Sequence, residues 1–476
     1  MQAVATPRAV EVSPVSQHVR HSSRGLLKLV TREGAAAQVY IAFTGGAFLA
    51  GLAILLGVND FQMGLLAALP FLAQAAQLIS PYLIERLDGR KRLTLTALTF
   101  GRLVWLPVIP LLFVAGTWRI YVLFALITLS AVSTMVATPA WFSWMSDLIP
   151  RGFRGRYLAT RSAVIAAVTL IVTVGGSILI DIARKHQWEP IGFALLLGSA
   201  VAVGLVASRT ARRLPDTAST ERHPRFAWKS LSLPLRDWKF LKLQKAFFVW
   251  NFAIGIGAAF FVPHMLLNLN MSFIQIGLYS GGATVVAILA NRPWGILIDR
   301  FGPRAVLVFC SVGIGAIPLV WLFPRPDLLW ILIPETIYSG FLWTGFNLAA
   351  FTIPIDRSPR AERPGYLAMF AVVTGMAFFL GSVLGGALAD YFEHLTVIIG
   401  SQTLVNYHVL FVLSAILRLI GALLLSLLRS PAEIRLPFMI QLMGYAVLKR
   451  LSLGRQISLF AAGADETDDS IHSHHH

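Results

Sequence analysis

The stretch Asp147-Leu-Ile-Pro-Arg-Gly-Phe-Arg-Gly-Arg-Tyr-Leu-Ala159 returns 209 positions later as Asp356-Arg-Ser-Pro-Arg-Ala-Glu-Arg-Pro-Gly-Tyr-Leu-Ala368. Seven of the thirteen residues agree, and each copy is a short basic loop between two long apolar stretches. In an apolar chain, a repeat of this kind predicts two similar halves, which are typical of carriers that work by alternating access.

Two shorter matches keep nearly the same offset. Gln62-Met-Gly-Leu65 pairs with Gln275-Ile-Gly-Leu278, and Glu85-Arg-Leu-Asp-Gly-Arg90 pairs with Asp299-Arg-Phe-Gly-Pro-Arg304. The offsets of the three matches lie between 209 and 214 residues. One short match could arise by chance, but three in register indicate a duplication.

Composition predicts that lipid is the main solvent of this chain. Of its 476 residues, 56% are hydrophobic and only 13% are charged, whereas ordinary soluble proteins carry about 25% charged residues. A membrane-spanning helix needs about 20 apolar residues. Twelve stretches meet this need: 34–57, 61–84, 93–116, 120–147, 157–180, 191–208, 246–268, 273–298, 305–323, 328–355, 366–389 and 407–428.

The distribution of basic residues predicts the topology. Segments on the side of the amino terminus hold 34 of the 40 Lys and Arg residues, and the loops on the opposite side hold four. The positive-inside rule therefore places both termini in the cytoplasm. The formal net charge of +17 is then a consequence of topology, and we expect no nucleic-acid partner.

These patterns predict an all-α membrane protein in which two six-helix bundles, residues 34–208 and 246–429, are related by pseudo-symmetry. Residues 1–33 form a cytoplasmic amino-terminal segment, residues 209–245 a basic cytoplasmic linker, and residues 430–476 an amphipathic tail that ends in the remnant of a histidine tag. We expect a monomer.

The sequence also excludes several classes. The single cysteine, Cys310, lies in the ninth span, so neither a disulfide nor a cysteine metal site forms within one chain. No glycine precedes a lysine, which excludes a phosphate-binding loop and hence an ATP-driven pump. We expect no catalytic residue, no metal and no cofactor.

The loop after the eighth span carries a family resemblance. Gly295-Ile-Leu-Ile-Asp-Arg-Phe-Gly-Pro-Arg304 fits the loop signature of the major facilitator superfamily, which is Gly, three residues, Asp, Arg, any residue, Gly and a basic residue. The first half carries a copy that departs from this signature at three positions. Pro81 replaces the first glycine, Glu85 replaces the aspartate and Asp88 is inserted. The chain resembles this family from the first span to the last.

The resemblance implies a charged latch at the cytoplasmic ends of the helices, which is thought to hold the outward-open state. A carboxylate is stabilised near the positive amino end of a neighbouring helix and a cation near the carboxyl end. The alternative is that the arginines only enforce topology. The latch residues would be Glu85, Arg86, Arg90, Asp147, Arg154, Asp299, Arg300, Arg304, Asp356 and Arg363.

The resemblance also places a substrate cavity between the halves, lined mainly by spans one, four, seven and ten. In span ten, Glu335 is a carboxylate inside the apolar zone, and Ser339, Trp343 and Asn347 follow it at steps of four, with Tyr338 beside them. Charge inside a bilayer is expensive and usually faces an interior or a water path. Glu335 is a candidate proton or cation-coupling residue; the alternative is a solvated position near the outer surface.

Other spans offer further candidates for substrate contact or coupling. Such polar and aromatic residues also serve as contacts between helices or as interface anchors. Span one, placed at 34–57, lacks the acidic residue of several proton symporters of the family. The further candidates are Gln74, Thr134, Trp141, Arg161 and Asn251.

The function indicated is secondary active transport of a small organic solute by alternating access, with a proton gradient as one candidate driving force and efflux favoured over uptake. One alternative is a lipid or lysolipid flippase of the same fold. Another is a membrane protein without transport activity, such as an assembly factor, a pigment-delivery factor or a sensor, which would have a blocked central cavity. We expect a multi-pass protein of the bacterial inner membrane, with the bilayer, a small-molecule or lipid substrate and protons as partners.

Overall fold

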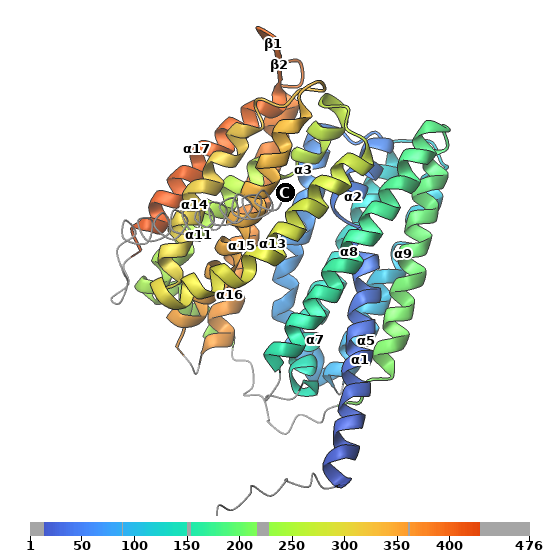
Figure 1. The fold of residues 1–476 in the computed structure, drawn as a ribbon, viewed down its shortest axis with the longest axis vertical. Coiled ribbons are helices and arrows are strands. Elements are labelled where there is room, and N and C mark those ends of the chain that lie inside the picture. Colours follow the sequence, from blue (N-terminus) through green and yellow to red (C-terminus); the bar gives the residue numbers. More distant parts are fainter. Residues whose placement is uncertain (1–13, 88, 150–153, 217–227, 360–361, 429–476) are drawn as a thin grey trace, which may run out of the picture.

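The chain folds into membrane-length helices and one short hairpin (Figure 1). The structure is a computed structural model that describes residues 14–87, 89–149, 154–216, 228–359 and 362–428, with side chains from residue 25 and without those of 154–156 and 228–231. The predicted tail, residues 430–476, and residues 217–227 of the predicted linker lie outside these residues.

The first half contains six spans, two of them interrupted by short breaks. The first break lies between Phe43 and Gly46, where Gly46 has a φ of 53° that favours glycine. The helices are α1 (Pro14–Phe43) with α2 (Gly46–Leu55), α3 (Asp60–Leu72) with η1 (Ala73–Ile79) and α4 (Ser80–Arg86), α5 (Arg90–Leu103) with α6 (Val108–Leu111), α7 (Trp118–Leu148), α8 (Arg154–Lys185) and α9 (Glu189–Arg212).

The second half repeats this arrangement after a short connecting helix, α10 (Trp228–Arg236). Asp237 caps the following helix by accepting from the backbone N–H groups of Lys239 and Phe240. The helices are α11 (Trp238–Ala258) with α12 (Phe261–Pro263) and η3 (His264–Asn268), α13 (Phe273–Phe301), α14 (Pro303–Val320), η4 (Leu329–Ile331) with α15 (Leu332–Arg357), α16 (Arg363–Tyr391) and α17 (Asn406–Ser426).

Eleven of the described helical segments are long and apolar enough to cross a membrane. The remaining predicted span, the tenth, is α15, which has 26 residues and falls short in hydropathy rather than length. Its polar residues, Glu335 among them, account for this difference. The fold is therefore the predicted all-α arrangement, and its tenth span is the most polar.

The first helix extends beyond the first predicted span. Helix α1 begins at Pro14, whereas the sequence prediction placed the start of the apolar stretch at residue 34. Lys28 and Arg32 are exposed on this helix while Glu33 is buried at 3% exposure. A scan along the sequence interprets such closely spaced charges as a loop, because it cannot separate the two faces of a helix. Glu33 thus lies on the buried face of α1, one residue before the predicted span.

The repeated Gln-x-Gly-Leu motif has a structural cause. Gln62 forms a reciprocal capping box with Asn59 at the start of α3, and Gln275 forms the same box with Ser272 at the start of α13. In each box the cap side chain accepts from the third backbone N–H of the helix, and the glutamine accepts from the backbone N–H of the cap residue. The duplication therefore preserves a capped helix start on the outer side of each half.

The loop between α16 and α17 contains a hairpin that the sequence did not reveal. Strands β1 (Thr396–Ile399) and β2 (Gln402–Val405) pair antiparallel, with Thr396 opposite Val405. Gly400 turns the chain with a φ of 63°. The hairpin projects at the top of Figure 1, and the start of α1 lies at the bottom, so the top is the predicted outer side.

The two halves meet at their outer ends. Helix α3 packs on α16, and α8 packs on α13. Phe71 stacks on Phe378 with ring centroids 3.6 Å apart, and the Ser382 hydroxyl donates to the Gly64 carbonyl oxygen at 2.9 Å. In Figure 1 the upper ends of α8 and α13 lie close together and their lower ends lie apart. The two halves are therefore in contact on the outer side.

Small residues allow this crossing of α3 and α16. A Cβ atom added at Gly64 would lie 2.5 Å from the Ser382 carbonyl oxygen and 2.7 Å from the Gly386 Cα. Gly381 and Gly385 lie in the same way against the backbone of α11. Close approach of backbones at glycine is a usual basis of helix association in membranes.

We expect Gly64→Val to destabilise this closed form by about 1–3 kcal/mol, because a side chain cannot fit between the two backbones. The measurement is the thermal unfolding midpoint of the purified protein. Gly198→Val is the matched control, since nothing lies within 4 Å of a Cβ added at Gly198 in α9. Equal midpoints for the two variants would contradict the prediction.

Candidate functional site

A cavity of about 450 Å3 lies between the two halves. Its walls come from α1, α2, α3 and α7 of the first half and from the end of the seventh span, at Ala258, Ala259 and Val262. Most of the lining is aliphatic. The polar side chains are few: Tyr40, Thr44, Trp105, Ser130 and Thr134.

The polar groups of this cavity form one hydrogen-bonded set. The Ser130 hydroxyl lies 3.1 Å from the Tyr40 hydroxyl, accepts from Trp105 Nε1 at 3.1 Å and donates to the Gly101 carbonyl oxygen at 2.9 Å. Thr134 donates to the Ser130 carbonyl oxygen. A ligand would find apolar walls and a few hydroxyl groups already engaged with the protein, which favours a largely apolar solute.

Of the sequence candidates, only Thr134 lines this central cavity. Tyr40 and Trp105 were not among them, because an aromatic residue inside an apolar run gives no signal of a site. Thr44 and Ser130 resemble the many hydroxyl residues that only join helices. What distinguishes these four residues is their convergence in space, which depends on how α1, α5 and α7 pack.

Glu335 lies inside the second bundle rather than in the central cavity. It is 3% exposed and points between α13 and α14, where the side chains of Tyr279, Ser339 and Trp321 interact with it. Within the described chain, neither carboxylate oxygen makes a hydrogen bond of good geometry. Leaving a buried charge without full hydrogen bonding is expensive, so a proton or a cationic group is needed to balance it.

The remaining candidates on α15 diverge from Glu335. Ser339 is buried beside it, but Asn347 is exposed. Tyr338 donates to the Gly313 carbonyl oxygen at 3.1 Å, and Trp343 packs edge-on against Phe346. Steps of four residues drift around a helix of 3.6 residues per turn by about 40° each, so three steps carry the stripe to another face.

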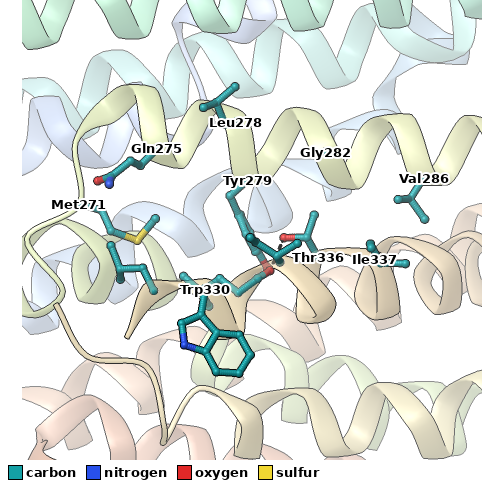
Figure 2. Close-up of a pocket in the computed structure, with 12 residues that line it drawn as sticks. Met271, Gln275, Leu278, Tyr279, Gly282, Val286, Trp330, Thr336 and Ile337 are labelled. Carbon is teal, nitrogen blue, oxygen red and sulfur yellow. Dashed lines mark hydrogen bonds between the residues drawn. The ribbon is translucent and has the colours of Figure 1, made fainter. Parts of the chain in front are cut away.

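An apolar groove of about 480 Å3 lies between the outer halves of α13 and α15 (Figure 2). Its rim contains Leu278, Ile333 and Ile337, which are all more than half exposed. Figure 2 shows Tyr279 pointing from α13 across the groove toward Thr336 on α15. Because Tyr279 also interacts with Glu335, one side chain separates the groove from the buried carboxylate.

A second buried carboxylate lies in the first half. Glu33 of α1 interacts with Arg102 of α5 and Arg161 of α8. Arg102 also donates to the Gly204 carbonyl oxygen at 2.9 Å and to the Ser208 hydroxyl at 2.6 Å. Two arginines thus lie near one carboxylate, although Glu33 Oε2 has no hydrogen-bond partner among the described residues. Glu33 was missed in the sequence because it precedes the first predicted span.

Trp141 and Arg161, which the sequence singled out separately, meet in the structure. The Arg161 guanidinium lies 5.4 Å from the centre of the Trp141 ring, a cation–π geometry. Both line a pocket of about 190 Å3 formed by α1, α7 and α8, with Ser146 as a further polar group. Because Glu33 also interacts with Arg161, its negative charge partly offsets the positive charge that Arg161 brings to the pocket.

Gln74 and Asn251 take part in helix contacts. A Cβ atom added at Gly375 would lie 2.8 Å from Gln74 Oε1, so Gln74 lies at the junction of the two halves. Asn251 donates to the carbonyl oxygen of Phe247 in its own helix at 2.8 Å. Neither residue lines the central cavity among the described residues.

Among the predicted latch residues of the first half, Arg90 and Asp147 form an ion pair. Arg90 is buried and binds Asp147 at 2.8 Å and the Ser143 hydroxyl at 2.7 Å, which joins α5 to α7. Glu85 and Arg86 are exposed at the cytoplasmic end of α4. The side chain of Arg154 is outside the described residues.

The latch residues of the second half are also near the cytoplasmic ends. Asp299, Arg300 and Asp356 are exposed. Arg304 donates to the Ser426 carbonyl oxygen of α17, and Arg363 donates to the Ser358 hydroxyl at 3.3 Å. Both of these bonds stay within the second half.

Comparison with known sequences gives distant relatives. An uncharacterised MFS-type transporter of Methanocaldococcus jannaschii is 26% identical over 163 residues, which is 32% of this chain and 40% of that protein. A homologue of the multi-drug resistance efflux pump PmrA from Lactococcus lactis is 30% identical over 172 residues, 33% of this chain and 39% of the relative. The matched region thus spans only about two fifths of these relatives.

Solved structures with the same fold cover most of the chain. A mutant of the nucleoside transporter NupG aligns with a TM-score of 0.68 and 11% identity over 85% of this chain and all of that one. A D-xylose–proton symporter aligns with a TM-score of 0.64 and 12% identity over 84% of this chain and 98% of the other. Likeness at this identity concerns the fold alone.

The family model described as Major Facilitator Superfamily matches residues 35–267 and residues 253–438. These ranges include both bundles and nearly all of the described residues. The protein is accordingly a multi-pass integral membrane protein of a transporter family rather than an enzyme. It belongs to the major facilitator superfamily.

Proposed function

We propose that this protein is a secondary active transporter that exports small, largely apolar organic solutes from the bacterial cytoplasm across the inner membrane. The observation that carries the proposal is the central cavity of about 450 Å3 between the two halves, with apolar walls and a short set of hydroxyl groups. Such a lining binds a solute mainly through apolar burial, at about 25 cal/mol for each Å2 removed from water.

Two observations support efflux. The halves are closed at their outer ends, so a solute enters this form from the cytoplasmic side. Among the distant relatives, one is a homologue of a multi-drug resistance efflux pump and another is a class H tetracycline resistance protein of Pasteurella multocida, 28% identical over 167 residues. The names of both relatives thus refer to drug efflux or drug resistance.

The proposed driving force is a proton gradient that acts through Glu335. Its carboxylate is buried and makes no hydrogen bond of good geometry within the described chain. A proton that binds and dissociates during transport would neutralise its charge. Glu33 is the second candidate, and it differs from Glu335 in that the positive charges of Arg102 and Arg161 lie near it. The solute would then bind in the central cavity and the proton at Glu335, and movement of α13 and α15 would couple the two binding events.

The groove between α13 and α15 favours a second candidate function, which is transport of a lipid or lysolipid. The groove is apolar and opens at membrane depth beside exposed Leu278 and Ile337, which suits an acyl chain. It lies within one half, however, and a flippase path is expected between the halves. The alternative without transport activity predicts a blocked centre, and the open central cavity favours transport over it.

We further propose that the charged residues at the cytoplasmic ends form the latch of the outward-open state. In the present form Asp299 and Asp356 are exposed and therefore free to approach the opposite half when the cytoplasmic side closes. A carboxylate would then face the positive amino end of a helix.

Filling the cavity tests the transport proposal. Ala131→Trp places an indole among the lining residues of α7, and we expect loss of efflux of apolar dyes from inverted vesicles. Ligands that raise the unfolding midpoint of the native protein should lose that effect, since a ligand at 100 times its Kd adds about 2.7 kcal/mol of stability. Leu195→Trp, at a 54% exposed position, is the control; undiminished efflux by Ala131→Trp would refute the proposed site.

Glu335→Gln tests the coupling. The amide keeps the shape but neither carries a charge nor exchanges a proton, so proton-driven flux and its dependence on pH should be lost while solute exchange without a gradient remains. Glu393→Gln, at an exposed position, is the matched control. If the variant keeps flux and its pH profile intact, Glu335 is not the coupling residue.

Asp299→Asn tests the latch. Removing the charge should lower the share of outward-open molecules, which is measured by labelling of cysteines placed on the two faces. Asp327→Asn, which replaces an exposed carboxylate on the outer side paired with Arg325, serves for comparison. Unchanged labelling on both faces in the Asp299 variant would rule out the latch.

A further inference from the structure

On the outer side, two carboxylates of the first half accept hydrogen bonds from the starts of helices in the second half. Asp181, near the outer end of α8, accepts from the backbone N–H groups of Phe273 and Ile274 at 2.8 Å each. Asp60, at the start of α3, accepts from Asn406 Nδ2 and from the Tyr407 hydroxyl at 2.6 Å each.

The contact of Asp181 completes the first turn of α13. The first N–H groups of a helix have no partner within the helix. In α13, Ser272 accepts from the third N–H group, and Asp181 accepts from the first two. A carboxylate is also stabilised at the positive amino end of a helix and destabilised near the carboxyl end of its own. Asp181 lies four residues before the end of α8, so its favourable partner is in the other half.

The contact of Asp60 ties three helices together. Asn406 donates both to Asp60 and to the Ala389 carbonyl oxygen of α16, and Tyr407 donates its hydroxyl to the same carboxylate. Asn406 and Tyr407 are 7% and 4% exposed. The carboxylate of α3 is thereby fixed to the outer ends of both α16 and α17.

We propose that Asp60 and Asp181 are the positioning residues that hold the outer side shut, and that the carrier must break both contacts to become outward-open. Separation of the halves leaves two N–H groups of α13 and the donors of Asn406 and Tyr407 without their acceptors. It also removes Asp181 from the positive helix end. The inference rests on the proposed alternating access, but it is independent of which solute is carried.

The corresponding outer end of the second half offers a control. Asp390 lies near the outer end of α16, just as Asp181 lies near the outer end of α8. The Asp390 side chain is exposed. The duplication thus provides the same residue type at a similar depth. A change there alters charge at the outer surface while the contacts of Asp60 and Asp181 stay in place.

The experiment measures the distance across the outer face in full-length protein without solute. Spin labels on His186→Cys and Ile398→Cys, both exposed, report on the two halves in a Cys310→Ala background. We expect Asp181→Asn and Asp60→Asn each to raise the ratio of open to closed molecules by about tenfold, which corresponds to about 1.4 kcal/mol. Asp390→Asn should leave the distribution unchanged.

The asparagine variants keep the shape of the side chain, and Asp181→Glu, which keeps the charge, should restore part of the closed population. Unchanged distances in both asparagine variants would overturn the proposal, as would an equal shift in Asp390→Asn. Because no solute is used, a negative result here is distinct from failure of the proposed export, which the Ala131→Trp assay reports.

Discussion

The fold depends on the need of every polar group in lipid to find its partner inside the protein. A bilayer offers neither water nor donors, so the backbone must be helical and polar side chains must meet one another. Arg102 meets this need with the Gly204 carbonyl oxygen and the Ser208 hydroxyl. Glu33 meets it in part, because two arginines lie near it while its Oε2 has no hydrogen bond within the described chain. Glu335 also meets it only in part, because neither of its carboxylate oxygens has a hydrogen bond of good geometry there.

The sequence predicted the architecture because its signals are local. Apolar runs of spanning length, the asymmetry of basic residues and three matches in register do not depend on how helices pack. The sequence did not single out Glu33, because the face of a helix, rather than its mean composition, decides whether a charge is buried. It missed the hairpin after α16 because that segment of eight paired residues carries no buried face and hence no alternation.

The candidate site was harder to predict, since it exists only after packing. Trp141 and Arg161 were recognised separately, but their pairing required α7 and α8 to lie together. The polar residues of α15 were recognised in the sequence. Because residues four positions apart do not stay on one face of a helix, Glu335 points inward and Asn347 points outward. Asp60 and Asp181 look like ordinary loop charges in the sequence, because their partners lie hundreds and tens of residues away in another half.

The outer contacts must be strong enough to close the carrier and weak enough to open it. A hydrogen bond to a charged group contributes roughly 1.5–3 kcal/mol, and hydration returns much of this when the groups reach water. Reversing an equilibrium from 1:99 to 99:1 requires about 5.5 kcal/mol of differential binding. Two carboxylates with two bonds each are of this order, so a solute or a proton that favours the open form suffices to reverse it. A larger set of cross-half bonds would lock the outer side, and a purely apolar contact would lack the directionality that returns the halves to register.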